Sequence, residues 1–120
     1  MHFSLIDRLC ARFQCKAEDL GPLISYSGNR EEVENILKNI RHVAWIDGFK
    51  YEVFCAGLTE DPIGKIFCHV HGLSLVDEYQ YNQGIMVKYK ELPCVMSDDP
   101  DGRRYYFPME IIDTLEVEEK

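Results

Sequence analysis

Two short apolar stretches near the end of the chain decide the fold: LPCVM at residues 92–96 and YFPME at residues 106–110. Apolar and aromatic residues fill both stretches, as is typical of strands. Between them, DDPDG at residues 98–102 combines acidic residues with proline and glycine, which indicates a loop. The sequence therefore predicts a strand at 92–96 and a last strand over 104–112 that is interrupted at Pro108.

Earlier in the chain, strand-like segments recur at short intervals, at residues 42–46, 50–56, 65–70 and 85–89. Asp47-Gly48 separates the first two and is a hairpin turn signal, and DPIG at residues 61–64 is a second turn signal. The capping-box spacing in SLVDEY at residues 74–79 predicts one short helix among the strands. Short strands separated by turn signals are typical of a small barrel or sandwich.

Two amphipathic helices are predicted before the first strand. The first is capped by Ser4 and carries apolar residues on one face as far as Phe13. Gly21-Pro22 then breaks the helical pattern. The second helix is capped by Asn29, and its apolar positions follow at helical spacing.

Length and composition fit one globular domain inside a cell. The chain has 120 residues, of which 46% are hydrophobic, which is enough for a core. Its apolar runs are much shorter than the roughly 20 residues that span a membrane, and no secretory-signal pattern is present. The five cysteines are odd in number and form no close C-x-x-C pair, which argues against a disulfide framework or a zinc site. We therefore expect reduced thiols and an intracellular location.

The net charge limits how nucleic acid could bind. The chain has 13 basic and 21 acidic residues, a net charge of −8, whereas nucleic-acid-binding modules usually carry a basic surface. The excess is uneven: residues 98–120 hold eight acids and three bases (−5), and residues 1–59 hold eight acids and seven bases (−1). A local neutral or basic surface is compatible with this distribution, but a wide, sequence-independent binding surface is disfavoured.

Four segments, in this order, are similar to motifs of the PAZ domain family: GLTEDP at residues 57–62, SLVDEY at 74–79, KYKELPCV at 88–95 and YFPME at 106–110. Each segment is weak evidence alone, but LPC followed 12 residues later by YFPME is much more specific. The two leading helices match the usual N-terminal pair of the family. The chain thus resembles, over almost its whole length, the PAZ domain of an Argonaute/Piwi-type protein.

The resemblance implies an α+β fold that is mainly β: an OB-like small β-barrel with an inserted β-hairpin and helix arm, preceded by two helices. It divides this single domain into leading helices at residues 1–41, barrel segments at 42–58 and 84–113, the inserted arm at 59–83 and an acidic tail at 114–120.

The function implied by the resemblance is to hold the 3′ end of a small single-stranded guide RNA within an Argonaute-type gene-silencing protein. Aromatic faces would stack on an unpaired terminal nucleotide, and tyrosine hydroxyls with a basic group would hold the last phosphates. Such a module is a holder and not an enzyme, it needs no cofactor, and its other partners would be the remaining domains of a parent protein. The location would be cytoplasmic or nuclear, including perinuclear granules.

Five residues match RNA 3′-end-binding positions of the family, and a sixth could replace a residue that the sequence lacks. Phe67 matches the residue that packs on the terminal nucleotide, Tyr79 and Tyr51 match tyrosines that bind phosphate, Arg103 matches a basic position that meets an upstream phosphate, and Phe107 lines the cleft; Tyr81 could replace a second helix tyrosine. Most of these positions also have a structural interpretation. Phe67 alternates with Ile66 and could pack in the core, Tyr51 could be a cross-strand packing residue, and Arg103 a solvated ion pair.

The sequence departs from the family pattern at two positions. Asp47 falls where a histidine often closes the first strand, and its carboxylate would repel phosphate. Gln83 falls near the position of the second helix tyrosine. With the acidic net charge, these departures favour an alternative function, in which a PAZ-fold domain that has lost 3′-end binding contacts a protein or serves as a structural module.

Catalytic and metal-binding readings find little support. Cysteine, histidine and aspartate are present, but no nucleophile elbow, phosphate loop or zinc signature frames them. His69 and His71 share a strand face, and two ligands are too few for a metal site. The sequence therefore predicts no catalytic residue and no metal.

Overall fold

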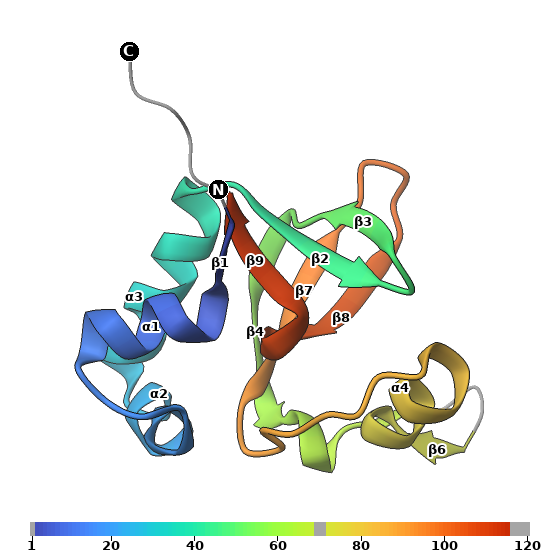
Figure 1. Cartoon of the computed structure of the whole chain (residues 1–120), viewed down its shortest axis with the longest axis horizontal. Helices are drawn as coiled ribbons and strands as arrows, with labels where there is room; N and C mark the ends of the chain where they lie inside the picture. Colours follow the sequence, from blue (N-terminus) through green and yellow to red (C-terminus); the bar gives the residue numbers. More distant parts are fainter. Residues whose placement is uncertain (1, 69–71, 116–120) are drawn as a thin grey trace.

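The computed structural model describes residues 2–68 and 72–115 of the chain (Figure 1). In chain order the elements are β1 (His2–Ser4), α1 (Leu5–Phe13), α2 (Leu20–Ile24), α3 (Ser27–Asn39), β2 (His42–Ile46), β3 (Phe49–Glu52), β4 (Cys55–Pro62), β5 (Phe67–Cys68), β6 (Leu73–Ser74), α4 (Leu75–Gln83), β7 (Pro93–Asp98), β8 (Arg104–Pro108) and β9 (Ile112–Leu115). Short 3₁₀ turns lie at Ala17–Asp19, Ile63–Lys65 and Met109–Ile111. Over this described part of the chain, no helix has the length and apolar character needed to cross a membrane.

The strands form two small antiparallel sheets and a separate hairpin. One sheet has the order β1-β9-β2-β3, the other β4-β7-β8, and β5 pairs with β6 in the arm. No pairing among the described strands joins the two sheets, so they do not close into a hydrogen-bonded barrel. The mainly β class with an inserted arm is confirmed. In Figure 1, α1 to α3 lie on one side of the sheets, and β6 and α4 project on the other.

The core lies between the sheets and the leading helices. Its members are large apolar side chains with almost no exposed surface, drawn from both halves of the chain: Leu5, Leu9, Leu20, Ile24, Val33, Val95, Phe107, Met109 and Ile112. Burial of this apolar surface is the main force that holds the helices on the sheets.

The helix boundaries differ from the sequence prediction at two points. Gly21-Pro22 does not end helical structure, because Pro22 lies in the first turn of α2, where its missing N–H has no intrahelical partner to lose. Asn29 does not cap α3, which begins two residues earlier at Ser27. Its side-chain nitrogen instead donates to the Leu23 carbonyl at 2.8 Å and ties α3 to α2. The Ser4 cap of α1 is confirmed, since its hydroxyl accepts the N–H of Asp7.

Two of the predicted strands are broken or absent. The segment predicted at residues 50–56 divides at Val53-Phe54, where the Phe54 N–H donates to the Ser97 hydroxyl at 2.8 Å. The segment predicted at 85–89 is irregular, because a side chain replaces a strand partner: the N–H groups of Lys88 and Tyr89 each donate to the Glu110 carboxylate at 2.9 Å.

Other strand boundaries also move. The last predicted strand divides after Pro108 into β8 and β9, with a 3₁₀ turn between them. β4 continues to Pro62, beyond the expected start of the arm at Thr59. β9 includes Thr114, which was expected in the acidic tail but is 1% exposed. The sequence did not predict β1, the first element along the chain, which pairs with β9.

The hairpin turn at Asp47-Gly48 is confirmed. Asp47 has φ 55° and Gly48 has φ 80°, the left-handed pair that a two-residue turn with the twist of a hairpin requires. Aspartate tolerates this conformation better than most residues. The departure from the family pattern at Asp47 thus has a local structural reason.

A buried hydrogen bond fastens β4 to β7 at the root of the arm. Past Leu58 the regular register between the two strands is interrupted. There the Thr59 Oγ1 accepts the Cys94 N–H at 2.9 Å and donates to the Asp61 carbonyl at 2.7 Å. The hydroxyl of Thr59 therefore supplies the acceptor that the missing backbone pairing would have supplied.

Helix α3 covers the outer edge of β4 with polar side chains. Arg30 donates to the carbonyls of Leu58 and Thr59, both at 2.6 Å, and Glu34 accepts the Leu58 N–H at 3.0 Å. Gly57, with φ 134°, forms the irregularity next to this contact, in a conformation that L side chains rarely adopt. Side chains of α3 thus hydrogen-bond backbone groups at the edge of β4, which protects this edge from pairing with another chain.

Replacing Thr59 by valine should destabilise the domain, because the buried Cys94 N–H loses its acceptor. We expect the free energy of unfolding to fall by about 1–3 kcal/mol, measured by urea denaturation. Thr59→Ser keeps the hydroxyl and is the matched control, with a smaller loss. A Thr59→Val protein as stable as the parent would show that this bond does not fasten the arm root.

Acid should weaken the fold through His42. This side chain is fully buried, its Nδ1 lies 2.7 Å from the Ile40 carbonyl, and its Nε2 has no hydrogen-bond partner among the described residues. Burial lowers the pKa of His42 in the folded chain, so as the pH falls through the unfolded value of about 6.5 the unfolded chain takes up the proton more readily than the folded chain. The free energy of unfolding should therefore decline as the pH falls from 7 towards about 5.

The control for this pH dependence is His42→Asn, whose side-chain nitrogen can reproduce the Nδ1 donor but does not titrate. The variant should be less stable at neutral pH and show a flatter stability profile from about pH 7 to 5. Equal profiles for parent and variant would assign the acid sensitivity to another group.

Candidate nucleic-acid interface

A cleft of about 430 Å³ lies between the arm and the sheets. Helix α4 supplies one wall and strands β2, β3 and β8 the other; the lining residues are Ile46, Tyr51, Leu75, Glu78, Tyr79, Gln83, Arg104, Tyr105 and Tyr106. This cleft lies between arm and sheet, the place where the motif resemblance predicts an RNA-end site. Its surface combines aromatic rings, two aliphatic side chains and a few polar groups.

On the arm side, Tyr79 ties the helix to the sheet. Ser74 caps α4 by accepting the Asp77 N–H at 3.1 Å, which fixes where the helix begins. One turn further on, Tyr79 is 8% exposed and its hydroxyl donates to the Tyr106 carbonyl of β8 at 2.7 Å. Burial strongly raises the pKa of this hydroxyl, which keeps it a neutral donor. Tyr79 therefore lines the cleft, but its hydroxyl proton is already donated to the Tyr106 carbonyl.

On the sheet side, three aromatic rings pack together. Tyr105 stacks on Phe107 with ring centroids 5.5 Å apart and an interplanar angle of 6°, and Tyr51 is tilted against both at 5.9 and 6.3 Å. Phe107 has no exposed surface and does not line the cleft; it supports Tyr105, which does. Sequence reasoning missed Tyr105, although strand alternation places it on the same face as Phe107.

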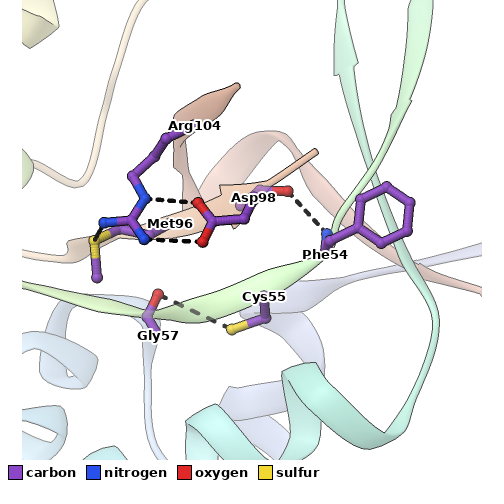
Figure 2. Close-up of polar contacts among 7 residues, drawn as sticks. Phe54, Cys55, Gly57, Met96, Asp98 and Arg104 are labelled. Carbon is purple, nitrogen blue, oxygen red and sulfur yellow. Dashed lines mark hydrogen bonds and ion pairs between the residues drawn. The ribbon is translucent and has the colours of Figure 1, made fainter. Parts of the chain in front are cut away.

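The cation of the cleft is already paired. Arg104 donates from Nε and Nη2 to the two carboxylate oxygens of Asp98 at 2.6 and 2.9 Å, and Figure 2 shows the guanidinium fork facing both oxygens. These bonds lower the pKa of Asp98, so the carboxylate stays ionised. Among the lining residues that the structure describes, Arg104 is the single basic one and Glu78 is acidic. The cleft thus has little net positive charge for a phosphate.

The other predicted site residues, Phe67, Tyr81 and Arg103, do not line the cleft. Phe67 and Tyr81 are on the arm, 63% and 71% exposed, so packing of Phe67 in the core is not its role. Arg103 is exposed on the turn before β8, one position ahead of the arginine that lines the cleft. Gln83, by contrast, is one of the residues that line the cleft. His69 and His71 fall outside the described residues.

A second cleft, of about 440 Å³, lies between the end of α3 and the start of β4. Its lining includes Val53, Phe54 and Arg41, and the Nε and Nη2 of Arg41 donate to the Glu52 carboxylate at 2.8 Å each. No sequence motif pointed to this surface, and it holds no arrangement of groups that would select a particular ligand.

Three solved structures share this arrangement of elements. The Drosophila Argonaute 2 PAZ domain, described for its recognition of nucleic-acid 3′ ends, has a TM-score of 0.72 and 17% identity, covering 97% of this chain and 96% of that one. A Drosophila Ago PAZ domain in complex with RNA 2′-O-methylated at its 3′ end has a TM-score of 0.69 and 14% identity, covering 97% and 100%. A structure of the Drosophila Argonaute2 PAZ domain, described together with its nucleic-acid binding, has a TM-score of 0.70 and 18% identity, covering 95% and 99%.

Neither a family model nor a curated protein matches the sequence. At the identities of the three solved structures, their agreement with this chain establishes the fold alone. That fold is a PAZ fold, complete from the leading helices to β9, as the motif resemblance predicted.

Removal of the Tyr79 hydroxyl should loosen the arm. Tyr79→Phe leaves the Tyr106 carbonyl without this donor, and we expect about 0.5–1.5 kcal/mol loss in the free energy of unfolding. Faster hydrogen exchange in α4 should accompany the loss. Tyr81→Phe removes the same group from an exposed position on the same helix and should change neither quantity. If both variants behave like the parent, Tyr79 does not hold the arm.

Proposed function

We propose that this chain binds the 3′ end of a single-stranded RNA in the cleft between α4 and the sheets. The observation that carries the proposal is the cleft itself: four tyrosines line a volume of about 430 Å³ between arm and sheet, in a fold whose solved examples are described as binding nucleic-acid 3′ ends. An unstacked terminal nucleotide fits such a surface, because aromatic faces stack on any base.

In this proposal the domain serves as the PAZ part of an Argonaute-type protein and holds a small guide RNA for gene silencing, in the cytoplasm or the nucleus. It breaks no bond and holds no cofactor. Phe67, exposed on the arm, packs on the terminal nucleotide; Tyr51 and Tyr105 contact the sugar or base. The partners are the RNA end and the other domains of the parent protein.

The charge of the cleft favours a second candidate function, in which the domain does not bind an RNA 3′ end. Arg104 is neutralised by Asp98, Glu78 adds a carboxylate, and the whole chain carries −8. Each phosphate contact normally uses a charge-assisted hydrogen bond of about 1.5–3 kcal/mol, and the described lining offers no free cation for one. The alternative is a PAZ-fold module without 3′-end binding that contacts a protein instead.

A labelled single-stranded RNA with a free 3′ end, compared with the same RNA bearing a bulky 3′ block, separates the two functions. We expect binding to require the free end and to weaken only shallowly with salt, since few phosphates are met. Phe67→Ala should weaken binding without unfolding the domain. Tyr26→Ala is the matched control, because Tyr26 is equally exposed (67%) but lies at the start of α3, away from the arm. Absence of binding by either RNA would favour the protein-interaction module.

Asp98→Asn should strengthen RNA binding. The change releases the Arg104 guanidinium for a phosphate and removes a negative charge beside the cleft. One added contact of about 1.4 kcal/mol corresponds to roughly tenfold in the dissociation constant. The gain should be lost in Asp98→Asn combined with Arg104→Gln. Unchanged or weaker binding in Asp98→Asn would mean that Arg104 does not meet the RNA.

A further inference from the structure

The C-terminal turn of α1 brings two cysteines together. Gln14 has φ 54°, the left-handed conformation that ends many helices, and the Cys10 carbonyl accepts the N–H of both Gln14 and Cys15, the latter at 3.1 Å. In this kind of helix end, the side chain three positions before the last helical residue contacts the side chain that follows the left-handed residue. Here those two side chains are the thiols of Cys10 and Cys15.

The two cysteines are neighbours and both remain partly accessible. The Cys15 N–H donates to the Cys10 carbonyl, the nearby Cys15 contributes to raising the pKa of Cys10, and both side chains are half-buried against the core. Both are free thiols in the structure. This pair replaces the apolar contact that usually closes such a turn, so it combines the packing role with a chemical reactivity that an apolar pair lacks.

The other described thiols have a different setting. Cys94 has no exposed surface, and its burial raises the pKa of the thiol to about 12. Burial also raises the pKa of Cys55, whose sulfur faces the Gly57 carbonyl and not a second thiol (Figure 2). Burial, and then the neighbouring Cys15, raise the pKa of Cys10 as well, so the reaction of this pair is faster at mildly alkaline pH.

We propose that Cys10 and Cys15 form a dithiol site that reacts with small disulfides and closes a reversible disulfide across the end of α1. One thiol loses its proton and attacks the small disulfide, forming a mixed disulfide and releasing one thiolate. The second thiol then loses its proton and attacks the cysteine sulfur of this mixed disulfide. The Cys10–Cys15 disulfide forms, and the other half of the small disulfide leaves as a thiolate. Both released thiolates take up a proton. The protein loses two hydrogen atoms and two electrons, and the small disulfide is reduced to two thiols.

The disulfide would fix the end of α1 to the segment that leads into the 3₁₀ turn at Ala17–Asp19. Helix α1 packs on β1 and β9 and contributes Leu5 and Leu9 to the core. Helix α1 lies on one side of the sheets, whereas α4, which forms one wall of the cleft, lies on the other side (Figure 1). The proposal is therefore independent of RNA binding.

Peptide mapping tests the proposal directly. The folded domain is incubated with oxidised glutathione at mildly alkaline pH, its remaining thiols are blocked with N-ethylmaleimide, and the unreduced protein is digested with trypsin. Cleavage after Arg8, Arg12 and Lys16 separates the cysteines into the peptides LCAR (9–12) and FQCK (13–16). We expect these two peptides joined by a disulfide that dithiothreitol removes. Peptides that carry only glutathione or maleimide would overturn the proposal.

A second measurement separates proximity in the folded state from reaction of unfolded chains. Phenylarsine oxide, whose trivalent arsenic bridges two neighbouring thiols, is added to the folded protein, and bound arsenic is measured by intact mass. We expect one bound arsenical in the parent, its loss in Cys10→Ser and in Cys15→Ser, and its retention in Cys55→Ser, the matched control. Circular dichroism verifies that each variant is folded. Arsenical binding that survives both Cys10→Ser and Cys15→Ser would overturn the assignment.

Discussion

The arrangement of arm and sheet depends on how β4 leaves the sheet. Where its pairing with β7 becomes irregular, Thr59 accepts the Cys94 N–H, and two residues of the next turn continue the attachment: the Ile63 N–H bonds the Leu92 carbonyl at 2.8 Å, and the Gly64 N–H bonds the Lys90 carbonyl at 3.0 Å. A side chain at Gly64 would come within 3.1 Å of that carbonyl oxygen. The arm is thus held at its root by these hydrogen bonds, with little space for a Cβ at Gly64, and the cleft owes its position to them.

The segments that carry the family resemblance contact one another. GLTEDP contacts KYKELPCV through the bond between Thr59 and the Cys94 N–H. YFPME contacts KYKELPCV through Glu110, which accepts the N–H groups of residues 88 and 89. SLVDEY contacts YFPME through Tyr79, which donates to the Tyr106 carbonyl. Each of these contacts satisfies a backbone group that regular pairing leaves unsatisfied. The motifs therefore indicate the fold and not RNA binding, and they would persist in a domain that had stopped binding RNA.

Sequence reasoning succeeded where the signal is local and failed where a distant group decides. The Ser4 and Ser74 caps and the Asp47-Gly48 turn depend on neighbouring residues, and all three are present. The strand predicted at residues 85–89 failed because Glu110, more than 20 residues away, takes its N–H groups. β1 was missed because three residues carry almost no periodicity and depend on β9 for their pairing. At the site, the sequence indicated the cleft but not that Arg104 would be neutralised by Asp98 or that Phe107 would be covered by Tyr105.

The hydroxyl of Tyr79 sets a condition on any phosphate that enters the cleft. A tyrosine has one proton to donate, and that of Tyr79 is given to the Tyr106 carbonyl, which holds α4 against β8. If a phosphate took this donor, the arm would lose the bond, and the carbonyl would need water or the ligand to replace it. Binding through Tyr79 must therefore be coupled to movement of the arm, whereas binding through the aromatic rings of Tyr51 and Tyr105 leaves the arm in place. In a cleft with a paired arginine and an added carboxylate, binding through the aromatic rings costs less, so the proposed RNA-end binding would depend on the terminal base and sugar more than on their phosphates.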